Sequence, residues 1–229
     1  MNPEGLLYSI AVWLIPLVVA IVFHEVAHGW VARAFGDPTA ARLGRLTLNP
    51  VRHVDPVGTI GLPLVLAVTG APVFGWAKPV PVVASRLRNP RLHMMLVALA
   101  GPGINLVLAL AAAVGLAALL AGDRATALSS VSGFVYANLL NFLLINVFLA
   151  IFNLIPLPPF DGGHVVEGLL PRSAVPAWQK VARFSFPLLI MLLLVVPMIA
   201  PEANIVARAV APIARLVVGG FHSLVGLEG

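Results

Sequence analysis

The stretch LLYSIAVWLIPLVVAIVFHEVAHGWVARAF, residues 6–35, decides what kind of protein this chain forms. A helix needs about 20 apolar residues to cross a bilayer, and this stretch is longer. Its second half carries His24, Glu25 and His28. Ionisable side chains inside a membrane span are unfavourable unless they are paired or bound, so we expect this helix to hold a functional site.

The composition of the whole chain also indicates a membrane protein. Of its 229 residues, 60% are hydrophobic and 10% are charged, whereas about a quarter of a soluble domain is charged. The absence of cysteine excludes a disulfide framework, a cysteine-type zinc site and a thiol nucleophile. Many basic residues lie between apolar runs, where they set topology and contact lipid headgroups. We therefore expect a lipid bilayer, and no nucleic acid, as a partner.

Further apolar runs complete the predicted fold. Residues 92–121, 131–155 and 181–200 are each long enough to span the membrane. The tail, residues 203–229, is either an interfacial amphipathic helix or a weak last span. The sequence therefore predicts an α fold: a multi-pass transmembrane helix bundle.

The chain is expected to form one integral membrane domain over residues 1–229. Its catalytic core is expected over about 6–170, and its C-terminal helices over about 178–229. Two segments depart from this pattern of spans. Residues 41–48 partly alternate and predict a short membrane-associated β element, and residues 57–74 are apolar but broken by Gly and Pro.

The distribution of basic residues predicts the topology. Arg33, Arg42, Arg45 and Arg52 follow the first span, and residues 75–91 are also basic. By the positive-inside rule both segments are cytoplasmic, so residues 57–74 are expected to be re-entrant or to lie in the interface, rather than to cross the membrane. The next two spans then return the chain to the cytoplasmic side. The active site is expected to face the cytoplasm, with the protein in the cell membrane.

The residues His24-Glu25-Val26-Ala27-His28 form an H-E-x-x-H motif on the first predicted helix. Side chains four residues apart share a helix face, so both imidazoles can reach one metal ion. Glu25 is offset around the helix and can approach a water molecule without binding the metal. The alternative is a chance match or a polar helix contact, and the apolar surroundings make this alternative the weaker one.

A catalytic zinc site usually has three protein ligands, so a third ligand is needed. Asp161 lies on the same predicted side as His24 and His28, where prolines end a helix and Gly162-Gly163 allow the chain to bend. A solvated turn aspartate is the alternative. The other candidates are Asp55, Asp123, Glu167, His53, His93 and His164, of which His53 and His93 are expected to be solvated.

Three motifs together resemble those of the site-2 protease family of intramembrane metalloproteases, peptidase family M50. They are the His24–His28 motif, Gly101-Pro102-Gly103-Ile104-Asn105, and the segment Asn153-Leu154-Ile155-Pro156-Leu157-Pro158-Pro159-Phe160-Asp161-Gly162-Gly163. Their order and spacing also match. The chain is similar to the minimal members of this family, which lack the PDZ and CBS domains of others.

The resemblance implies a zinc-dependent metalloendopeptidase that cleaves transmembrane segments of membrane proteins. It implies one zinc ion held by His24, His28 and Asp161, and Glu25 as the general base. It also implies that Asn105 lines the active site and helps to hold the substrate or its oxyanion. From the residues alone, an interhelical hydrogen bond is an equally good role for Asn105.

Two other functions are the alternatives to this one. A membrane transporter or channel with an intramembrane metal or proton site would be expected to spread polar residues over several spans, but here they cluster. A metal-stabilised scaffold would not need a base such as Glu25. The two-histidine, one-carboxylate set would also admit iron. An extended edge at Leu43–Leu48 or Val80–Val83 is expected to hold an unwound substrate by β-augmentation.

Overall fold

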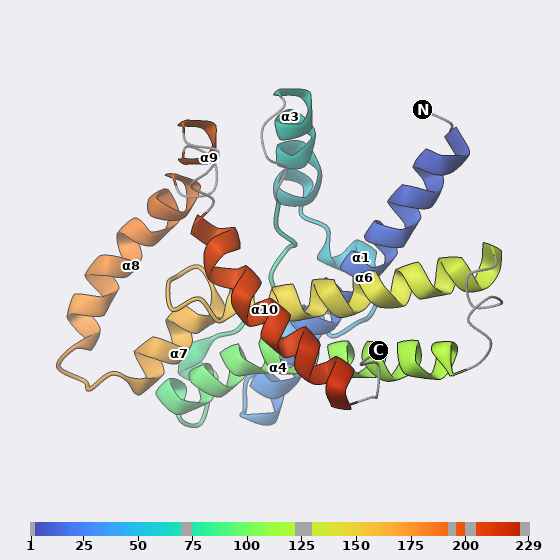
Figure 1. Cartoon of the computed structure of the whole chain (residues 1–229). Coiled ribbons are helices and arrows are strands. Elements are labelled where there is room, and N and C mark those ends of the chain that lie inside the picture. Colours follow the sequence, from blue (N-terminus) through green and yellow to red (C-terminus); the bar gives the residue numbers. More distant parts are fainter. Residues whose placement is uncertain (1–2, 70–74, 122–129, 192–195, 200–204, 225–229) are drawn as a thin grey trace.

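The computed structural model describes residues 3–69, 75–121, 130–191, 196–199 and 205–224 (Figure 1). Within these ranges the chain is helical and contains no strand. Three helices are long and apolar enough to cross a membrane, namely Leu7–Ala34, Pro90–Leu120 and Val131–Asn153. The predicted multi-pass helical bundle is therefore confirmed.

The elements follow in this order: α1 (Pro3–Ala34), α2 (Thr39–Arg42), η1 (Pro50–His53), η2 (Pro56–Gly61), α3 (Leu62–Thr69), η3 (Ala84–Arg86), α4 (Pro90–Leu120), α6 (Ser130–Asn153), α7 (Asp161–Leu169), α8 (Val175–Ile190), α9 (Val196–Ile199) and α10 (Ile205–Leu224). Helices α1, α4 and α6 pack against one another, α7 packs against α4, and α10 lies across α6 (Figure 1).

Helix α1 continues through Pro16 because another helix satisfies the backbone group that the proline leaves unpaired. Proline has no N–H, so the carbonyl of Val12 loses its helical partner. Asn141 of α6 donates its side-chain N–H to this carbonyl at 2.7 Å. A polar side chain on a neighbouring span thus replaces water, which is absent at this depth of a membrane.

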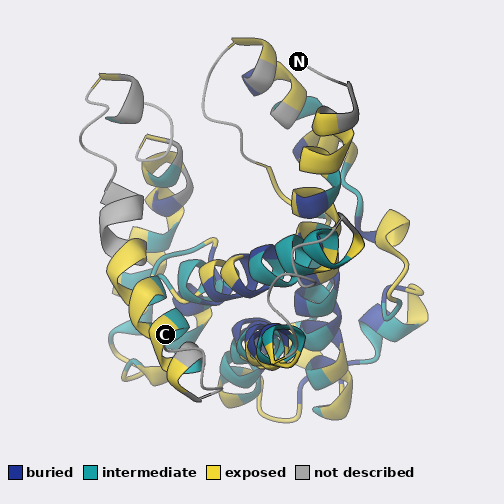
Figure 2. Ribbon diagram, turned by 45° about the vertical axis from the view of Figure 1, so that its right-hand side comes forward, coloured by how far each residue is buried: buried dark blue, intermediate teal, exposed yellow. Residues whose placement is uncertain are grey.

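The contact between α4 and α6 is built on small residues. Ala109, Ala112 and Ala113 of α4 are buried against Leu143 and Val147 of α6. Small side chains let two helix backbones approach closely where no water drives them together. The buried residues run along this contact, while the outward faces of the helices are exposed (Figure 2).

The residues on either side of the predicted re-entrant segment, 57–74, lie close to one another. Trp76 donates its N–H to the carbonyl of Gly58 at 3.1 Å, and Lys78 donates to His53 at 2.8 Å. Between these contacts, η2 and α3 stand away from the other helices (Figure 1). Gly58 is required because a Cβ there would overlap the ring of Trp76. Residues 70–74 lie outside the described residues.

The predicted strand at residues 41–48 is wrong. Ala41 and Arg42 belong to α2, which ends in a Schellman motif. Gly44 has a φ of +63°, and the N–H groups of Gly44 and Arg45 donate to Ala41 at 3.0 Å and Ala40 at 2.9 Å. A glycine in the left-handed conformation ends a helix in this way, and the alternating pattern concealed this signal.

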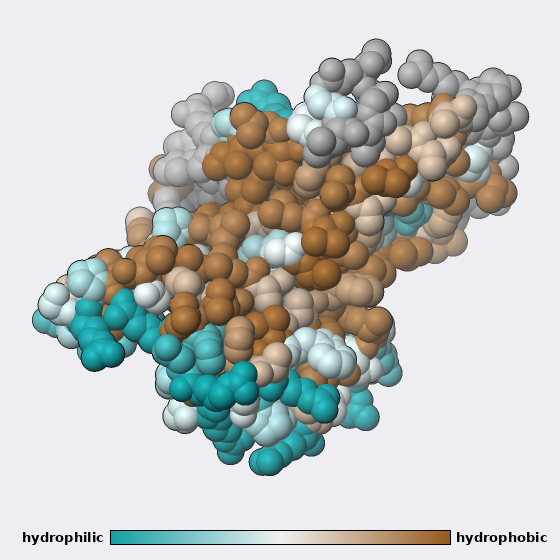
Figure 3. Space-filling model, turned by 90° about the horizontal axis from the view of Figure 1, so that it is seen from below, coloured by the Kyte–Doolittle hydropathy of each residue, from teal (hydrophilic) through white to brown (hydrophobic). Residues whose placement is uncertain are grey.

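The predicted fourth span is not among the helices long and apolar enough to cross a membrane in the described parts of the chain. Helix α8 begins earlier than predicted and ends at Ile190, and residues 192–195 fall outside the described chain. In the tail, α10 packs on the α4–α6 contact through Ala214, Val217, Val218 and Phe221. Seen from below, hydrophilic side chains gather at one edge, and apolar side chains cover much of the remaining face (Figure 3).

Candidate metal centre

The buried end of α1 carries the two histidines of the H-E-x-x-H motif. His24 and His28 are 7% and 9% exposed and lie one turn apart on the face that meets α4. Helix α4 comes this close because residue 101 is glycine. A Cβ at Gly101 would lie 2.5 Å from Cε1 of both imidazoles. The first glycine of the Gly-Pro-Gly motif therefore makes room for the two rings.

Asp161 meets the two histidines from the other end of the sequence. Its Oδ2 lies 3.2 Å from Nε2 of His24 and 3.4 Å from Nε2 of His28. The two Nε2 atoms are 3.0 Å apart. The structure thus brings together the three side chains that the sequence predicts as metal ligands, and these three form a group able to hold a metal ion.

The loop between α6 and α7 brings Asp161 to this position. Helix α6 ends at Asn153, and Asp161 is the first residue of α7. A Cβ at Gly162 would overlap the carbonyl of Ile155, and a Cβ at Gly163 would lie 2.7 Å from the nitrogen of Pro158. Only glycines permit this tight packing, so the Gly-Gly pair fixes the direction from which the carboxylate enters the site.

Hydrogen bonds orient both imidazoles. Nδ1 of His28 lies 2.7 Å from the carbonyl of Val97, and Nδ1 of His24 lies 2.5 Å from Oδ1 of Asn105. Both partners are acceptors, so each Nδ1 carries the proton and donates it. Each Nε2 is then left as a lone pair directed at the centre. Partners of this kind fix the tautomer and ring orientation of histidines that bind metals.

Asn105 is part of a buried polar chain between helices. Its side chain has no exposed area and donates Nδ2–H to Oδ1 of Asn146 on α6 at 2.7 Å. Asn146 in turn donates to the carbonyl of Phe142 at 2.8 Å. The interhelical hydrogen bond that the sequence left open is therefore present. It connects α6 to the orientation of His24.

Glu25 lies beside the three side chains and is anchored separately. Its Oε2 accepts the N–H of Val80 at 2.7 Å. Val80 belongs to the segment Val80–Val83, in which Val83 has an extended backbone and donates to Asp37 at 2.6 Å. Since Pro81 has no N–H, Val82 supplies the only N–H of these four residues that is not directed at a carboxylate.

The other candidate ligands lie elsewhere. Asp55 caps η2 by accepting from Val57 and Gly58, Glu167 accepts from Gln179, and His164 is exposed. His93 stacks on Phe35. His53 was expected to be solvated, which is wrong: it is 3% exposed and hydrogen-bonds the carbonyl of Thr47 at 2.9 Å. Asp123 falls outside the described residues.

Asp37, which was not predicted from the sequence, is buried where the chain leaves α1. It accepts hydrogen bonds from the N–H and hydroxyl of Thr39 and from the N–H of Val83. Burial acts to raise the pKa of Asp37, but these hydrogen bonds, with the nearby charge of Arg86, outweigh it and hold the pKa below its usual range. The Gly36-Asp37-Pro38 turn predicted only a helix end.

The donor set fits a zinc ion. Oδ2 of Asp161 is buried without a hydrogen-bond donor, and it faces two imidazole lone pairs. Three acceptors at this separation repel one another unless a cation lies between them. Ligands about 2.1 Å from a tetrahedral zinc are about 3.4 Å apart, close to the observed 3.0–3.4 Å. Two histidines and one carboxylate also leave a coordination position open, as catalytic zinc requires.

The fold and this site together define a class: a multi-pass helical membrane protein with a candidate metal centre where a span meets a returning loop. Comparison with known proteins gives the family. The model for peptidase family M50 matches residues 12–196, so the chain belongs to that family. The resemblance predicted from the three motifs is thereby confirmed.

Named relatives agree with this assignment. The chain is 38% identical over 185 residues to "Putative zinc metalloprotease YwhC" of Bacillus subtilis (strain 168), which covers 81% of this chain and 80% of that protein. It is 30% identical over 196 residues to "Putative zinc metalloprotease Rip2" of Mycobacterium tuberculosis (strain ATCC 25618 / H37Rv), covering 85% of this chain and 68% of that protein. No solved structure matches the chain.

Proposed function

We propose that this chain is an intramembrane zinc metalloendopeptidase that hydrolyses peptide bonds in or near transmembrane segments of membrane proteins. The observation that carries the proposal is the convergence of His24, His28 and Asp161 to within 3.4 Å of one another, with Glu25 next to His24 in the chain. Membership of peptidase family M50 supports the reaction type, and the three apolar helices support the site of action.

Each residue has a separate task in the proposed mechanism. His24, His28 and Asp161 would hold one zinc ion, which when bound polarises the scissile carbonyl and makes a water molecule acidic near neutral pH. Glu25 takes a proton from the attacking water and delivers it to the leaving amine. Asn105 keeps His24 in the tautomer that presents Nε2. A direct contact of Asn105 with substrate would require its buried amide to exchange partners.

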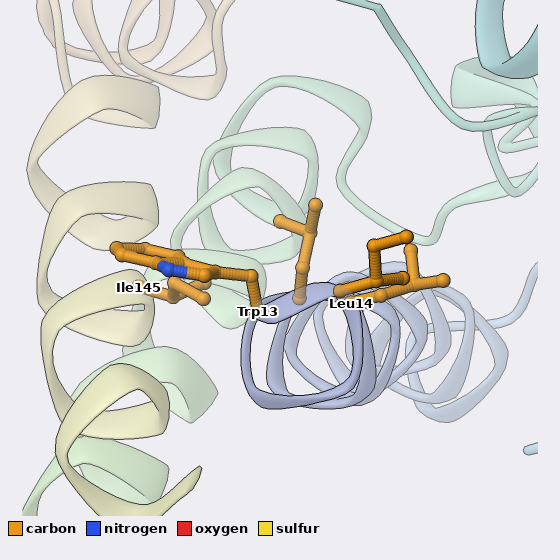
Figure 4. Close-up of a pocket in the computed structure, with 5 residues that line it drawn as sticks. Trp13, Leu14 and Ile145 are labelled. Carbon is orange, nitrogen blue, oxygen red and sulfur yellow. The ribbon is translucent and has the colours of Figure 1, made fainter. Parts of the chain in front are cut away.

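An apolar groove supports a transmembrane segment as the substrate. Ile10, Trp13, Leu14 and Leu17 of α1 line it together with Ile145 of α6, around about 460 Å³ (Figure 4). The α1 residues share one helix face, and positions 7 and 11 residues beyond Leu17 are His24 and His28. An apolar segment lying in this groove would therefore be directed along α1 toward the metal ligands.

The chain has no cysteine, so this groove can be tested with single-cysteine variants. Leu14→Cys is expected to form a disulfide crosslink with a cysteine in the transmembrane segment of a reporter substrate. Ile15→Cys is the matched control, because Ile15 is 51% exposed at the same depth and points away from the groove. Equal crosslinking at both positions would mean that the substrate has no preference for the groove, and no crosslinking at Leu14→Cys would mean that lipid rather than substrate covers this face.

The remaining features of the proposal concern topology. Residues 6–170 form the catalytic core. The site opens toward the cytoplasmic side of the cell membrane. The return of the chain from Gly58 to Trp76 supports a re-entrant hairpin. Val80–Val83 is the better edge for an unwound substrate, since Val80 lies beside Glu25 and Val83 has an extended backbone, and pairing there would use Val82 and the carbonyl groups.

The decisive experiment compares Glu25→Gln with the wild type in purified protein loaded with zinc, using a single-span reporter substrate. We expect cleavage to fall by a factor of about 10² to 10⁴, the usual contribution of a general base, while zinc content is unchanged. Glu167→Gln makes the same chemical change away from the proposed ligands and should leave cleavage intact. Full cleavage by Glu25→Gln would refute the role of Glu25 as the base. No cleavage by the zinc-loaded wild type would refute the proteolytic function and favour a transporter or channel.

A further inference from the structure

The carboxylate of Glu25 is held by a backbone donor that comes from a segment remote in sequence. The N–H of Val80 reaches Oε2 at 2.7 Å across a separation of 55 residues. Val80 lies between Pro79 and Pro81, and proline has no N–H. Within the described stretch from Pro79 to Pro81, Val80 therefore offers the single backbone donor, and that donor is directed at Glu25.

The segment that carries this donor is fixed from several directions. The side chain of Val80 is buried and packs over Gly29, where a Cβ would lie 2.8 Å from Cγ1 of Val80. On one side, Arg45 donates to the carbonyl of Lys78 at 2.7 Å. On the other side, Val83 donates to Asp37 at 2.6 Å. The donor therefore has a defined position relative to α1.

Within the described chain, this is the one hydrogen bond found for the Glu25 carboxylate. A long glutamate side chain on a helix has several rotamers, and few of them would aim an oxygen at the reacting atoms. With Oε2 anchored, the direction of the second oxygen is set, and that oxygen stays free to accept a proton.

We infer that the N–H of Val80 is a positioning group that aims the Glu25 carboxylate at the attacking water. This inference rests on the proposed function for the role of Glu25 as a base. The hydrogen bond itself can be tested without any activity. The segment Lys78–Val83, which contains Pro79 and Pro81, then holds one N–H donor in a fixed position beside the Glu25 carboxylate. This role is separate from any contact that the segment makes with substrate.

The first test measures hydrogen–deuterium exchange of the backbone amides in the full-length protein. Val80 N–H is expected to exchange slowly in the wild type and much faster in Glu25→Ala. Val83 N–H, which Asp37 holds, serves as the internal control and should keep its protection in Glu25→Ala. An equally fast exchange of Val80 in both proteins would overturn the inference, whatever the outcome of the cleavage assays.

The second test separates the N–H from the side chain. Val80→Pro removes the donor, whereas Val80→Ala keeps the donor and removes the packing. With a reporter substrate, Val80→Pro is expected to lower kcat about 10- to 100-fold, since a small misplacement of a catalytic group has effects of this size. KM and zinc content should stay within about twofold, and Val80→Ala, in which Arg45 and Asp37 still hold the segment, should lose clearly less kcat than Val80→Pro. Equal losses in both variants would contradict the inference.

Discussion

Two buried polar clusters lie along the C-terminal part of α1, and they use carboxylates in opposite ways. In the candidate metal centre, Oδ2 of Asp161 is buried without a hydrogen-bond donor and faces two imidazole nitrogens. In the second cluster, just beyond the helix, Asp37 accepts hydrogen bonds from Thr39 and Val83 at both oxygens. The first arrangement would be stabilised by a cation, while the second is complete with protein donors alone.

This difference distinguishes a site from a structural link. A buried carboxylate saturated with N–H and O–H donors fixes the chain, as Asp37 does by joining the end of α1 to Val83. A set of acceptors that face one another is unfavourable in the absence of a ligand and therefore marks a binding position. Glu25 is intermediate, with one oxygen anchored by Val80.

The largest expected effect comes from removing the Asp161 carboxylate from the candidate metal centre. Asp161→Ala should abolish both zinc binding and cleavage, because it deletes a proposed ligand and leaves two histidines. The loss of affinity should exceed the roughly 10- to 100-fold that follows from losing an outer hydrogen-bond partner. Zinc per protein is measured after dialysis. Asp55→Asn, which alters a helix cap, should retain zinc, and equal retention by Asp161→Ala would exclude it as a ligand.

A smaller loss is expected when the partner of His24 is removed. Asn105→Ala deletes the acceptor of Nδ1–H and should weaken zinc binding about 10- to 100-fold. Asn141→Ala is the matched control, since it also removes a buried interhelical asparagine, but one that bonds Val12. It should lower stability and leave zinc affinity unchanged. Competition with a fluorescent chelator measures the affinities; an identical shift in both variants would argue against an orienting role.

Adding a methyl group beside the two imidazoles should also weaken zinc binding. In Gly101→Ala the new methyl group would lie 2.5 Å from both imidazoles, and overpacking of this type costs about 1–3 kcal/mol. We expect zinc affinity to fall about tenfold. Gly103→Ala adds the same methyl group two residues on, where a Cβ meets nothing within 4 Å. Zinc titration should therefore show weaker binding in Gly101→Ala than in Gly103→Ala. Equal binding by the two variants would count against the close approach of α4 to the two histidines.

The smallest effect on zinc is expected at the second cluster. Asp37→Asn should leave zinc affinity unchanged but lower the free energy of unfolding by about 1–3 kcal/mol through lost charged hydrogen bonds. Because the folded-state pKa of Asp37 is lowered, its contribution is fully present above the ordinary aspartate pKa of about 3.9 and is lost as the pH falls through the folded-state value. Thermal unfolding should therefore show a smaller difference in stability between the wild type and Asp37→Asn at pH 3 than at pH 7.

The three apolar spans and the pairing of His24 with His28 could be predicted from local sequence alone. Both follow from local spacing, since span length and helix periodicity depend only on neighbouring residues. The boundaries of α6 were predicted closely, over 131–155 against the observed Ser130–Asn153. The span predicted over 181–200 overlaps α8, Val175–Ile190, which is not among the candidate spans of the described chain. Asp161 was predicted because charge placement constrains which side of a membrane each loop occupies.

How these parts meet depends on the packing of the folded chain. The bond from Val80 to Glu25, the chain from His24 through Asn105 to Asn146, and the cluster at Asp37 each join residues from different segments of the chain. The strand predicted at 41–48 became a helix end because backbone hydrogen bonds at Gly44 and Arg45 close that turn. Composition and periodicity report which face of an element is apolar, but a hydrogen bond between remote segments depends on how those segments pack.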